Sequence, residues 1–199
     1  MSEKKYVAYV GSYTHGSSRQ GIHVYDVDVE NGTLTERSSV EVSNASHMAV
    51  SKNGKYLYSI EDEGVAVFKR DKNGDLSRIN SVNIDGMRGC HLSTDTKGKY
   101  LYVAGYHDGK VTVVHTHRDG RLGSVMDGVF HKGLGSVAER NFRPHVSCVR
   151  PTPDGKYLCA VDNGIDQIKI YRPTERTSKL DLVDVLRCVR ESGPRLNVP

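Results

Sequence analysis

A five-residue phrase, Gly-Lys-Tyr-Leu-Tyr, occurs at residues 54–58 and 98–102, and it returns as Gly-Lys-Tyr-Leu-Cys at 155–159. A polar turn precedes each copy, and a second strand-like run follows it. Self-similarity at a period of about 20–50 residues indicates stacked supersecondary units rather than one conventional core. This repeat therefore constrains the fold more than any other feature of the chain.

Aligned on that phrase, the copies define a unit of four strands. A short apolar strand comes before the turn, and the Lys-Tyr strand follows it. An alternating strand comes next, as in 65–68, 111–114 and 168–171, and an outer strand closes the unit, as in 76–82 and 122–129. Alternation between Gly, Asn and Asp turns is typical of half-buried strands. Four strands repeated at about 40–50 residues predict an all-β fold, a β-propeller of four-stranded antiparallel blades.

We expect residues 1–199 to form a single partial propeller domain. The phrases start 44 residues apart (54 to 98) and then 57 apart (98 to 155), and the excess lies in 130–143. This insertion, rich in Gly and cations, is either a functional loop or a surface loop without a role. The approximate blades are 1–44, 45–85, 86–140 and 141–190, and a fifth begins in 191–199.

Composition narrows the class of protein. Eleven Tyr, three Phe and no Trp supply the aromatic residues, and Tyr suits a half-buried sheet surface. The net charge of +4 is spread along the chain, which argues against nucleic-acid binding and fits a small anionic ligand. The sequence predicts neither a membrane span nor a signal peptide, because it has no sufficiently long apolar run.

The four cysteines show no Cys-x-x-Cys pair and no zinc-ligand spacing; they are Cys90, Cys148, Cys159 and Cys188. In a chain of this length such cysteines are typical of reduced, mostly buried thiols. We therefore expect a soluble cytoplasmic protein.

Two histidines recur at the same place in the repeat. His47 and His91 lie eight residues before Lys55 and Lys99, at the start of the strand that lines the channel of a propeller. A residue that recurs in this way is interpreted as structural, tying its own blade to the next by hydrogen bonds. The alternative is that His91 contacts a substrate.

His145 does not share this register. It lies three residues before Cys148, which occupies the recurring position, and it follows Pro144 beside the inserted loop that carries Arg140 and Arg143. A neutral imidazole can take a proton from water near pH 7, and neighbouring cations favour the neutral form. His145 is therefore a candidate general base. The alternative is a solvent-exposed loop histidine.

Other chemistry-bearing residues give weaker signals. His115 and His117 lie on one face of a strand, which permits metal binding, but no carboxylate or third histidine is near them in the sequence. We expect no metal site and no cofactor. Asp162 and Asp166 bracket a turn, and we expect both to cap it by accepting backbone N–H groups.

Six segments, in order along the chain, carry a family resemblance; they are Tyr9–Thr14, Cys90–Ser93, Gly98–Ala104, Arg143–Ser147, Asp162–Asp166 and Ser192–Arg195. Together they resemble the seven-bladed β-propeller lactonases. That family contains the cycloisomerase-type 6-phosphogluconolactonases and the fungal carboxymuconate lactonizing enzymes. The resemblance covers essentially the whole chain. It implies hydrolysis of 6-phospho-D-glucono-1,5-lactone in the pentose phosphate pathway, without a metal or an organic cofactor.

The resemblance also implies site residues. In the fungal enzymes a His after Pro and the Arg of a Gly-Pro-Arg motif belong to the proposed active site, and the matching positions here are His145 and Arg195. His145 would take the proton of the attacking water. Arg195 would bind the developing oxyanion or a substrate anion. The loop cations Arg140 and Arg143 would meet the phosphate of a small sugar-phosphate lactone.

The chain departs from the family pattern in three ways. Family members are longer, Leu196 follows the Gly-Pro-Arg motif where a His is usual, and Ser147 replaces a second His. We therefore expect about four blades of a seven-bladed design, with part of the active site absent. Uncovered blade faces and open sheet edges would favour self-association.

Two other functions stay open. One is a propeller that serves as a binding platform without catalysis, since fold does not dictate function. The other is a carboxymuconate-type lactonizing enzyme, which shares the site logic with a different anion.

Overall fold

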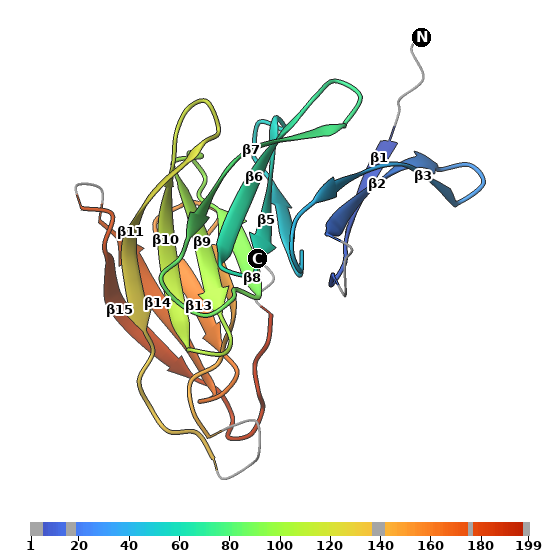
Figure 1. The fold of residues 1–199 in the computed structure, drawn as a ribbon. Coiled ribbons are helices and arrows are strands. Elements are labelled where there is room, and N and C mark those ends of the chain that lie inside the picture. The colour runs from blue at the N-terminus through green and yellow to red at the C-terminus, as the bar shows by residue number, and fades with distance from the viewer. Residues whose placement is uncertain (1–5, 15–18, 137–141, 175–176, 197–199) are drawn as a thin grey trace.

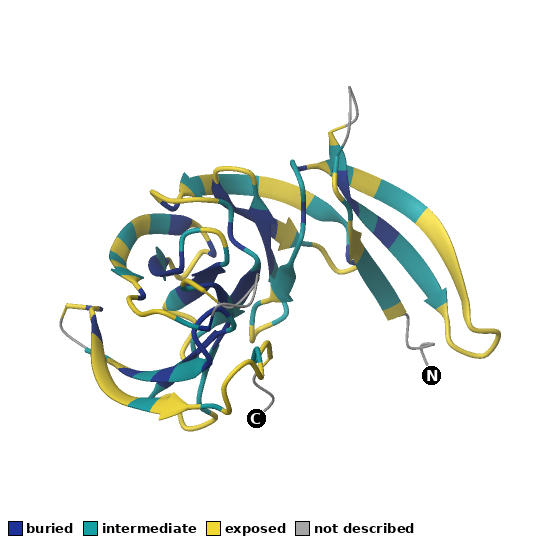
Figure 2. Cartoon of the chain, turned by 90° about the horizontal axis from the view of Figure 1, so that it is seen from below, coloured by how far each residue is buried: buried dark blue, intermediate teal, exposed yellow. Residues whose placement is uncertain are grey.

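The computed structural model describes residues 6–14, 19–136, 142–174 and 177–196. All the regular secondary structure in those ranges consists of β-strands. The strands form four antiparallel sheets, here called blades 1 to 4, which follow one another along the chain and are arranged in an arc (Figures 1 and 2). The predicted all-β propeller fold is confirmed.

Blade 1 has three strands and the other blades have four. Blade 1 holds β1 (Tyr6–Gly11), β2 (Gln20–Asp28) and β3 (Thr33–Glu41). Blade 2 holds β4 (Met48–Val50), β5 (Tyr56–Glu61), β6 (Gly64–Arg70) and β7 (Leu76–Asn83). Blade 3 holds β8 (His91–Thr94), β9 (Tyr100–Gly105), β10 (Lys110–Thr116) and β11 (Leu122–Phe130). Blade 4 holds β12 (Val146–Pro151), β13 (Leu158–Asp162), β14 (Gln167–Pro173) and β15 (Leu180–Arg187).

The strands of each sheet pair in chain order, with β4, β8 and β12 innermost. The order of blade 1 places β1 where the other blades have their second strand. Within the described residues, blade 1 therefore has no strand equivalent to β4, β8 and β12. The second edge of β1 has no strand partner in the described part of the chain.

The repeated phrase forms the turn between the first two strands of blades 2, 3 and 4. Its glycines, Gly54, Gly98 and Gly155, have φ values of 70°, 69° and 70°, the left-handed region that favours glycine. After each turn the tyrosine N–H donates a hydrogen bond to a side-chain oxygen at the start of the turn. The pairs are Tyr56 with Ser51, Tyr100 with Asp95, and Tyr157 with Thr152. The phrase therefore repeats because the same turn is built three times.

Three apolar clusters hold the blades together, one at each junction (Figure 2). Phe68 packs with Ile22 between blades 1 and 2. Val65 packs with Leu101 between blades 2 and 3, and Tyr102 packs with Leu158 between blades 3 and 4. Face-to-face packing of this kind is the expected arrangement of propeller blades.

The outermost strand of blade 4 carries exposed apolar side chains. Leu182, Val183 and Leu186 are 55%, 45% and 55% exposed. An apolar surface of this kind favours association. Self-association through the outer blades stays a prediction.

Two turn glycines provide a test of the packing between blades. Gly98 and Gly120 both have positive φ, but a Cβ at Gly98 would meet nothing within 4 Å, whereas one at Gly120 would lie 2.3 Å from the Tyr56 ring of the neighbouring blade. Gly98→Ala should cost about 1–2 kcal/mol from the backbone alone. Gly120→Ala should cost about 1–3 kcal/mol more because of the clash. Urea unfolding measures both, and equal losses of stability would contradict this account.

Candidate functional site

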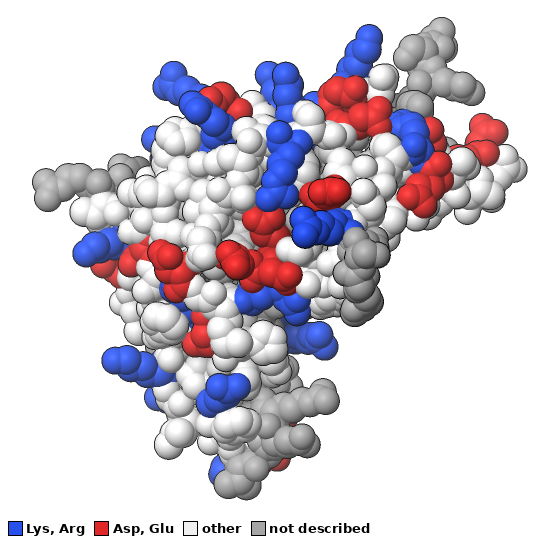
Figure 3. Space-filling model, in the orientation of Figure 1, with Lys and Arg blue, Asp and Glu red and all other residues white. Residues whose placement is uncertain are grey.

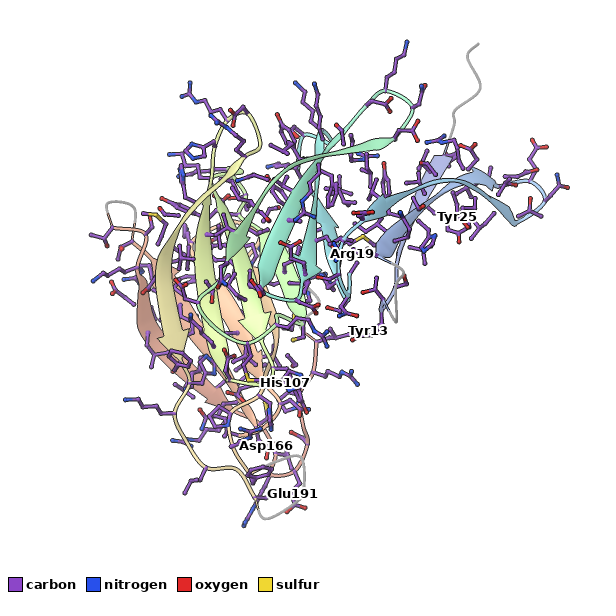
Figure 4. The ribbon with its side chains drawn as sticks, in the orientation of Figure 1. Tyr13, Arg19, Tyr25, His107, Asp166 and Glu191 are labelled. Carbon is purple, nitrogen blue, oxygen red and sulfur yellow. The ribbon has the colours of Figure 1, made fainter. Side chains whose placement is uncertain are left out.

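A cleft of about 710 Å³ lies at the end of the blades where the inner strands begin. All four blades or their adjoining loops contribute to it, together with the segment after β15. Tyr13, from the loop after β1, and His107, from the turn after β9, are labelled in Figure 4. The lining residues are Tyr13, Ser46, His47, Arg88, Gly89, Cys90, His91, Tyr106, His107, Ser147, Arg150, Arg195 and Leu196.

The rings of the two recurring histidines contact each other in this cleft, with centroids 4.3 Å apart and planes tilted by 40°. Nδ1 of His47 accepts the N–H of Leu92 in the next blade, at 3.3 Å. Nδ1 of His91 accepts the N–H of Val149 in the blade after that, at 3.4 Å. Each histidine therefore ties its blade to the following one, as the sequence predicts.

These hydrogen bonds also set the tautomers. An Nδ1 that accepts a backbone N–H carries no proton, so the neutral ring carries its proton on Nε2. Burial lowers the pKa of His47, and burial with the neighbouring His47 and Arg150 lowers the pKa of His91 to about 4. Both rings are neutral at pH 7. Nε2 of His91 contacts the Cys148 sulfur at 3.7 Å, whereas Nε2–H of His47 has no partner among the described residues.

Arg150 is a cation whose charge acts on both histidines. It projects from β12, is half-buried and lowers the pKa of both histidines. It makes no ion pair and no side-chain hydrogen bond with any residue that the structure describes. A half-buried guanidinium without a counter-ion at the wall of a cleft is suited to bind an anion.

Two further arginines lie at the edge of the cleft. Arg88 pairs with Asp62 at 3.2 Å and lies over the Tyr13 ring, 5.2 Å from its centroid. Arg195 is exposed, and its carbonyl accepts the Ser147 hydroxyl at 2.8 Å. The lining has no carboxylate, so all of its formal charges are positive.

Asp166 holds the segment that brings Arg195 to the cleft. Its carboxylate accepts the N–H of Glu191 at 2.7 Å and that of Gly193 at 2.9 Å (Asp166 and Glu191 are labelled in Figure 4). The prediction that Asp166 caps its own turn is wrong, because its oxygens bind these distant N–H groups. Asp162 does cap the turn, accepting the N–H of Gly164 at 3.1 Å.

Cys90 lines the same cleft as a neutral thiol. Burial raises its pKa to about 11, and its sulfur donates toward the Val146 carbonyl at 3.4 Å. A thiol with such a pKa is a poor nucleophile at pH 7. Cys90 is therefore not suited to form a covalent intermediate with a substrate at neutral pH.

His145 lies behind the lining of the cleft. Its Nδ1–H donates to the Tyr106 carbonyl at 2.7 Å, its ring stacks on the Tyr106 ring at 4.4 Å, and it is only 5% exposed. The interpretation of His145 as an exposed loop residue is therefore wrong. Through these two contacts His145 holds Tyr106 in place, and Tyr106 itself lines the cleft. The proton-transfer role of His145 stays a prediction.

The buried carboxylate of Asp162 holds the segment around His145 in place. The Asp162 carboxylate accepts the N–H of His145 at 2.8 Å and pairs with Nδ1 of His131 at 2.7 Å, with both partner side chains of that pair fully buried. Burial lowers the pKa of His131. The hydrogen bond to Asp162 raises this pKa, but burial is the larger effect, so the pKa lies below its ordinary value. Asp162 therefore joins the loop before β12 to the end of β13.

Of the loop cations, Arg143 is described by the structure, and it does not line the cleft. Arg143 is exposed, and its guanidinium lies 5.6 Å from the centroid of the Phe142 ring rather than in the lining. Arg140 lies outside the described residues. Their contact with a substrate phosphate stays a prediction. Of the predicted site residues, the cleft thus brings together Arg195 and His91.

His115 and His117 make an edge-to-face contact, with centroids 4.7 Å apart. Across the described ranges, no group of three or more His, Cys, Asp or Glu side chains is placed to hold a metal ion. The same ranges contain no helix long and apolar enough to cross a membrane.

Arg150, Arg88 and the tether at Asp166 are absent from the sequence-based predictions. The repeat carries a signal for the first. Counting five residues back from each phrase glycine gives Ala49, Ser93 and Arg150, so the cation stands out where the other copies have small side chains. The remaining two have no such signal, because their partners are far away in the sequence.

The low pKa of His91 predicts a pH-dependent stability. In the unfolded protein His91 has a pKa near 6.5, whereas in the folded protein its pKa is about 4. As the pH falls below 6.5, the unfolded state therefore binds a proton before the folded state does. Stability present above pH 6.5 is therefore lost as the pH falls toward 4. His91→Gln, which keeps an acceptor but does not titrate, should lose less stability between pH 7 and 4.5. Urea midpoints at both pH values measure this, and an identical loss in both proteins would exclude His91 as a source.

The comparisons with known proteins agree with this geometry. The family model described as "Lactonase, 7-bladed beta-propeller" matches residues 7–198. A 6-phosphogluconolactonase of Bacillus subtilis is 39% identical over 174 residues, which cover 84% of this chain and 49% of that protein. A 6-phosphogluconolactonase of Formosa agariphila is 30% identical over 198 residues, covering 94% and 56%.

Solved structures give the same result. A Bacteroides fragilis protein superposes with a TM-score of 0.87 at 33% identity, covering 98% of this chain and 58% of its own. The periplasmic gluconolactonase of Pseudomonas aeruginosa gives 0.87 at 27% identity, covering 96% and 57%. The chain thus spans about half the length of the relatives it matches. With the family model matching nearly all of it, this chain belongs to the seven-bladed β-propeller lactonase family.

Proposed function

We propose that this chain binds an anionic sugar lactone in the cleft and hydrolyses it to the open acid, with 6-phosphogluconolactone as the substrate. The observation that carries the proposal is Arg150, a half-buried guanidinium without a counter-ion beside two neutral imidazoles. The 6-phosphogluconolactonases among the relatives give the substrate class. The cleft of about 710 Å³ is within the usual range for a small-molecule site.

Lactone hydrolysis needs three contributions from such a cleft. Water attacks the lactone carbonyl and gives up a proton, negative charge develops on the carbonyl oxygen, and the ring C–O bond then breaks as the ring oxygen takes up a proton. The Nε2–H of His47 is free to donate to that oxygen, and the Arg195 guanidinium lies at the same cleft. Arg150 and Arg88 would bind the phosphate, because guanidinium groups suit phosphate oxygens.

The proton of the attacking water is assigned to His145. The hydrogen bond from its Nδ1–H to Tyr106 leaves Nε2 as the basic nitrogen, which is the tautomer that a general base requires. The ring also supports Tyr106 from behind. Positioning of Tyr106 and proton transfer are thus two separate roles for His145, and variants distinguish them.

We propose a cytoplasmic location on the basis of the cysteines. All four thiols are free, which is typical of a reducing compartment. The periplasmic gluconolactonase of Pseudomonas aeruginosa has the same fold, so the fold alone does not assign a compartment.

Removing the Arg150 charge should weaken substrate binding. A lost hydrogen bond to a charged group is worth about 1.5–3 kcal/mol, so Arg150→Ala should lower kcat/KM about 10- to 100-fold, mainly through KM. Arg150→Lys should fall in between. Arg172→Ala is the matched control, because Arg172 lies over Tyr157 outside the cleft. Unchanged kcat/KM in Arg150→Ala refutes the assignment, whereas binding of 6-phosphogluconate without turnover of the lactone identifies a binding module.

The two roles of His145 differ in what asparagine can replace. Asn can donate to the Tyr106 carbonyl but cannot take a proton. If His145 is the base, both His145→Ala and His145→Asn lose about 10²–10⁴-fold in kcat, and the acidic limb of the pH–rate profile disappears. If it only positions Tyr106, His145→Asn keeps most of the turnover and the whole profile. Wild-type kcat in both variants would eliminate both roles.

A further inference from the structure

A second groove lies at the opposite end of the blades from the cleft. It has a volume of about 780 Å³ and runs between blades 2 and 3. The cleft adjoins the residues before β4 and β8, and the groove adjoins the turns after those strands, so the two share no lining residue. Its lining residues are Ser51, Lys52, Asn53, Tyr56, Tyr58, Thr94, Lys97, Gly98, Lys99, Tyr100, His115, Thr116, His117 and Arg118.

The groove collects cations from three different turns. Lys52 comes from the turn after β4, Lys99 from the turn after β8, and Arg118 from the turn after β10. The Lys52 ammonium donates to the Thr96 carbonyl at 3.2 Å, a neutral partner. The side chains of Lys99 and Arg118 form no ion pair within the described ranges. Figure 3 shows Lys and Arg side chains projecting at the upper end of the molecule, where these turns lie in Figure 1.

No carboxylate lines this groove. The two acidic residues next to it in the sequence have other partners. Asp95 accepts the backbone N–H groups of Lys99 and Tyr100, at 2.6 and 2.9 Å. Asp119 pairs with Arg121 at 2.9 Å. The positive charge of the groove is therefore not neutralised by ion pairs to these two groups.

The corresponding groove between blades 3 and 4 is different. It has about 650 Å³ and includes the carboxylates of Asp95 and Asp154 in its lining. The two carboxylates come from different copies of the repeat: blade 2 has Ser51 where blade 3 has Asp95, and blade 3 has Lys97 where blade 4 has Asp154. Two exchanges within the repeat thus leave the first groove cationic while the second is mixed. Because the turn itself is the same in both blades, turn geometry does not explain this difference.

Aromatic rings form one wall of the cationic groove. The turn at Gly120 lies against the Tyr56 ring, so closely that a Cβ there would be 2.3 Å from it. The Tyr100 ring meets His115 edge-on at 6.1 Å, and His115 meets His117 at 4.7 Å. Neither histidine side chain has a hydrogen bond to any described residue, so both can donate to an anion.

We propose that this groove is a second ligand site, which binds a phosphate-rich anion such as a polyphosphate chain, either inorganic or carried by a nucleotide. Cations on three separate turns match several anionic oxygens of one ligand better than a single small anion. The exposed ring of His117 offers a surface on which a nucleotide base can stack. The site does not depend on the proposed lactonase activity, since it lies away from the cleft.

Calorimetric titration of the whole chain with tripolyphosphate, ATP and adenosine tests the proposal. Tripolyphosphate and ATP should bind, and their affinity should fall as the salt concentration rises, because exposed charges are screened. Tighter binding of ATP than of tripolyphosphate assigns the site to nucleotides, and equal binding assigns it to the phosphate chain alone. The proposal is overturned if neither tripolyphosphate nor ATP binds at low salt. It is also overturned if adenosine binds as tightly as ATP does.

Charge reversal at exposed positions locates the site. Lys52→Glu and Arg118→Glu should each weaken tripolyphosphate binding at least tenfold. Lys156→Glu is the matched control, because Lys156 holds the repeat position of Lys99 but lines only the mixed groove; it should change affinity less than twofold. Equal losses in all three variants indicate a diffuse charge effect and refute the site. Lys52→Glu should cause the same loss of tripolyphosphate affinity in an Arg150→Ala background as in the unaltered chain, and a loss that disappears in that background places the ligand in the cleft instead.

Discussion

Every blade is held in place by the packing of one sheet face against the next. Strand β6 makes this plain, because all four residues from Val65 to Phe68 are fully buried. Ala66 and Phe68 face blade 1, whereas Val65 and Val67 face blade 3. A strand that is covered on both sides needs apolar residues at every position, which is why this segment is a continuous apolar run. The arc of blades follows from repeating this contact.

Packing fixes the strands and leaves their ends free to differ. The repeat requires a Gly turn, a tyrosine N–H and an apolar strand, and it places few demands on the residues between. Residues that bind ligands can therefore lie at the two ends of the blades. At one end the inner strands begin and form the cleft; at the other the turns form the cationic groove. Neither site needs a change in the packed region.

The sequence predicts the strands well because their signal is local. Alternation, turn glycines and the repeated phrase lie within a few residues of one another, so the blades can be read directly. The inter-blade bonds of His47 and His91 are also predictable, because repetition itself marks a structural role. Which strands of blade 1 lie at the edges of its sheet could not be predicted this way, since that depends on pairing rather than on local pattern.

The site is predicted less well, because it depends on contacts between distant segments. His145 departs from the register of the repeat and was for that reason assigned to the chemistry, yet its Nδ1–H and ring face Tyr106. Its neighbours come from another blade, which the local sequence does not reveal. Asp166 illustrates the same point, since its carboxylate holds a segment about 25 residues away.

Comparison between copies of the repeat is more informative than any single motif. Arg150 replaces the small residues Ala49 and Ser93 of the other copies, and it lies in the cleft. Ser51 and Lys97 take the places of Asp95 and Asp154, and the groove that they line has no carboxylate. Since packing fixes the shared positions, a change of charge at one copy alone has no structural cause in the repeat. Such positions are where a propeller chain can acquire a ligand without altering its fold.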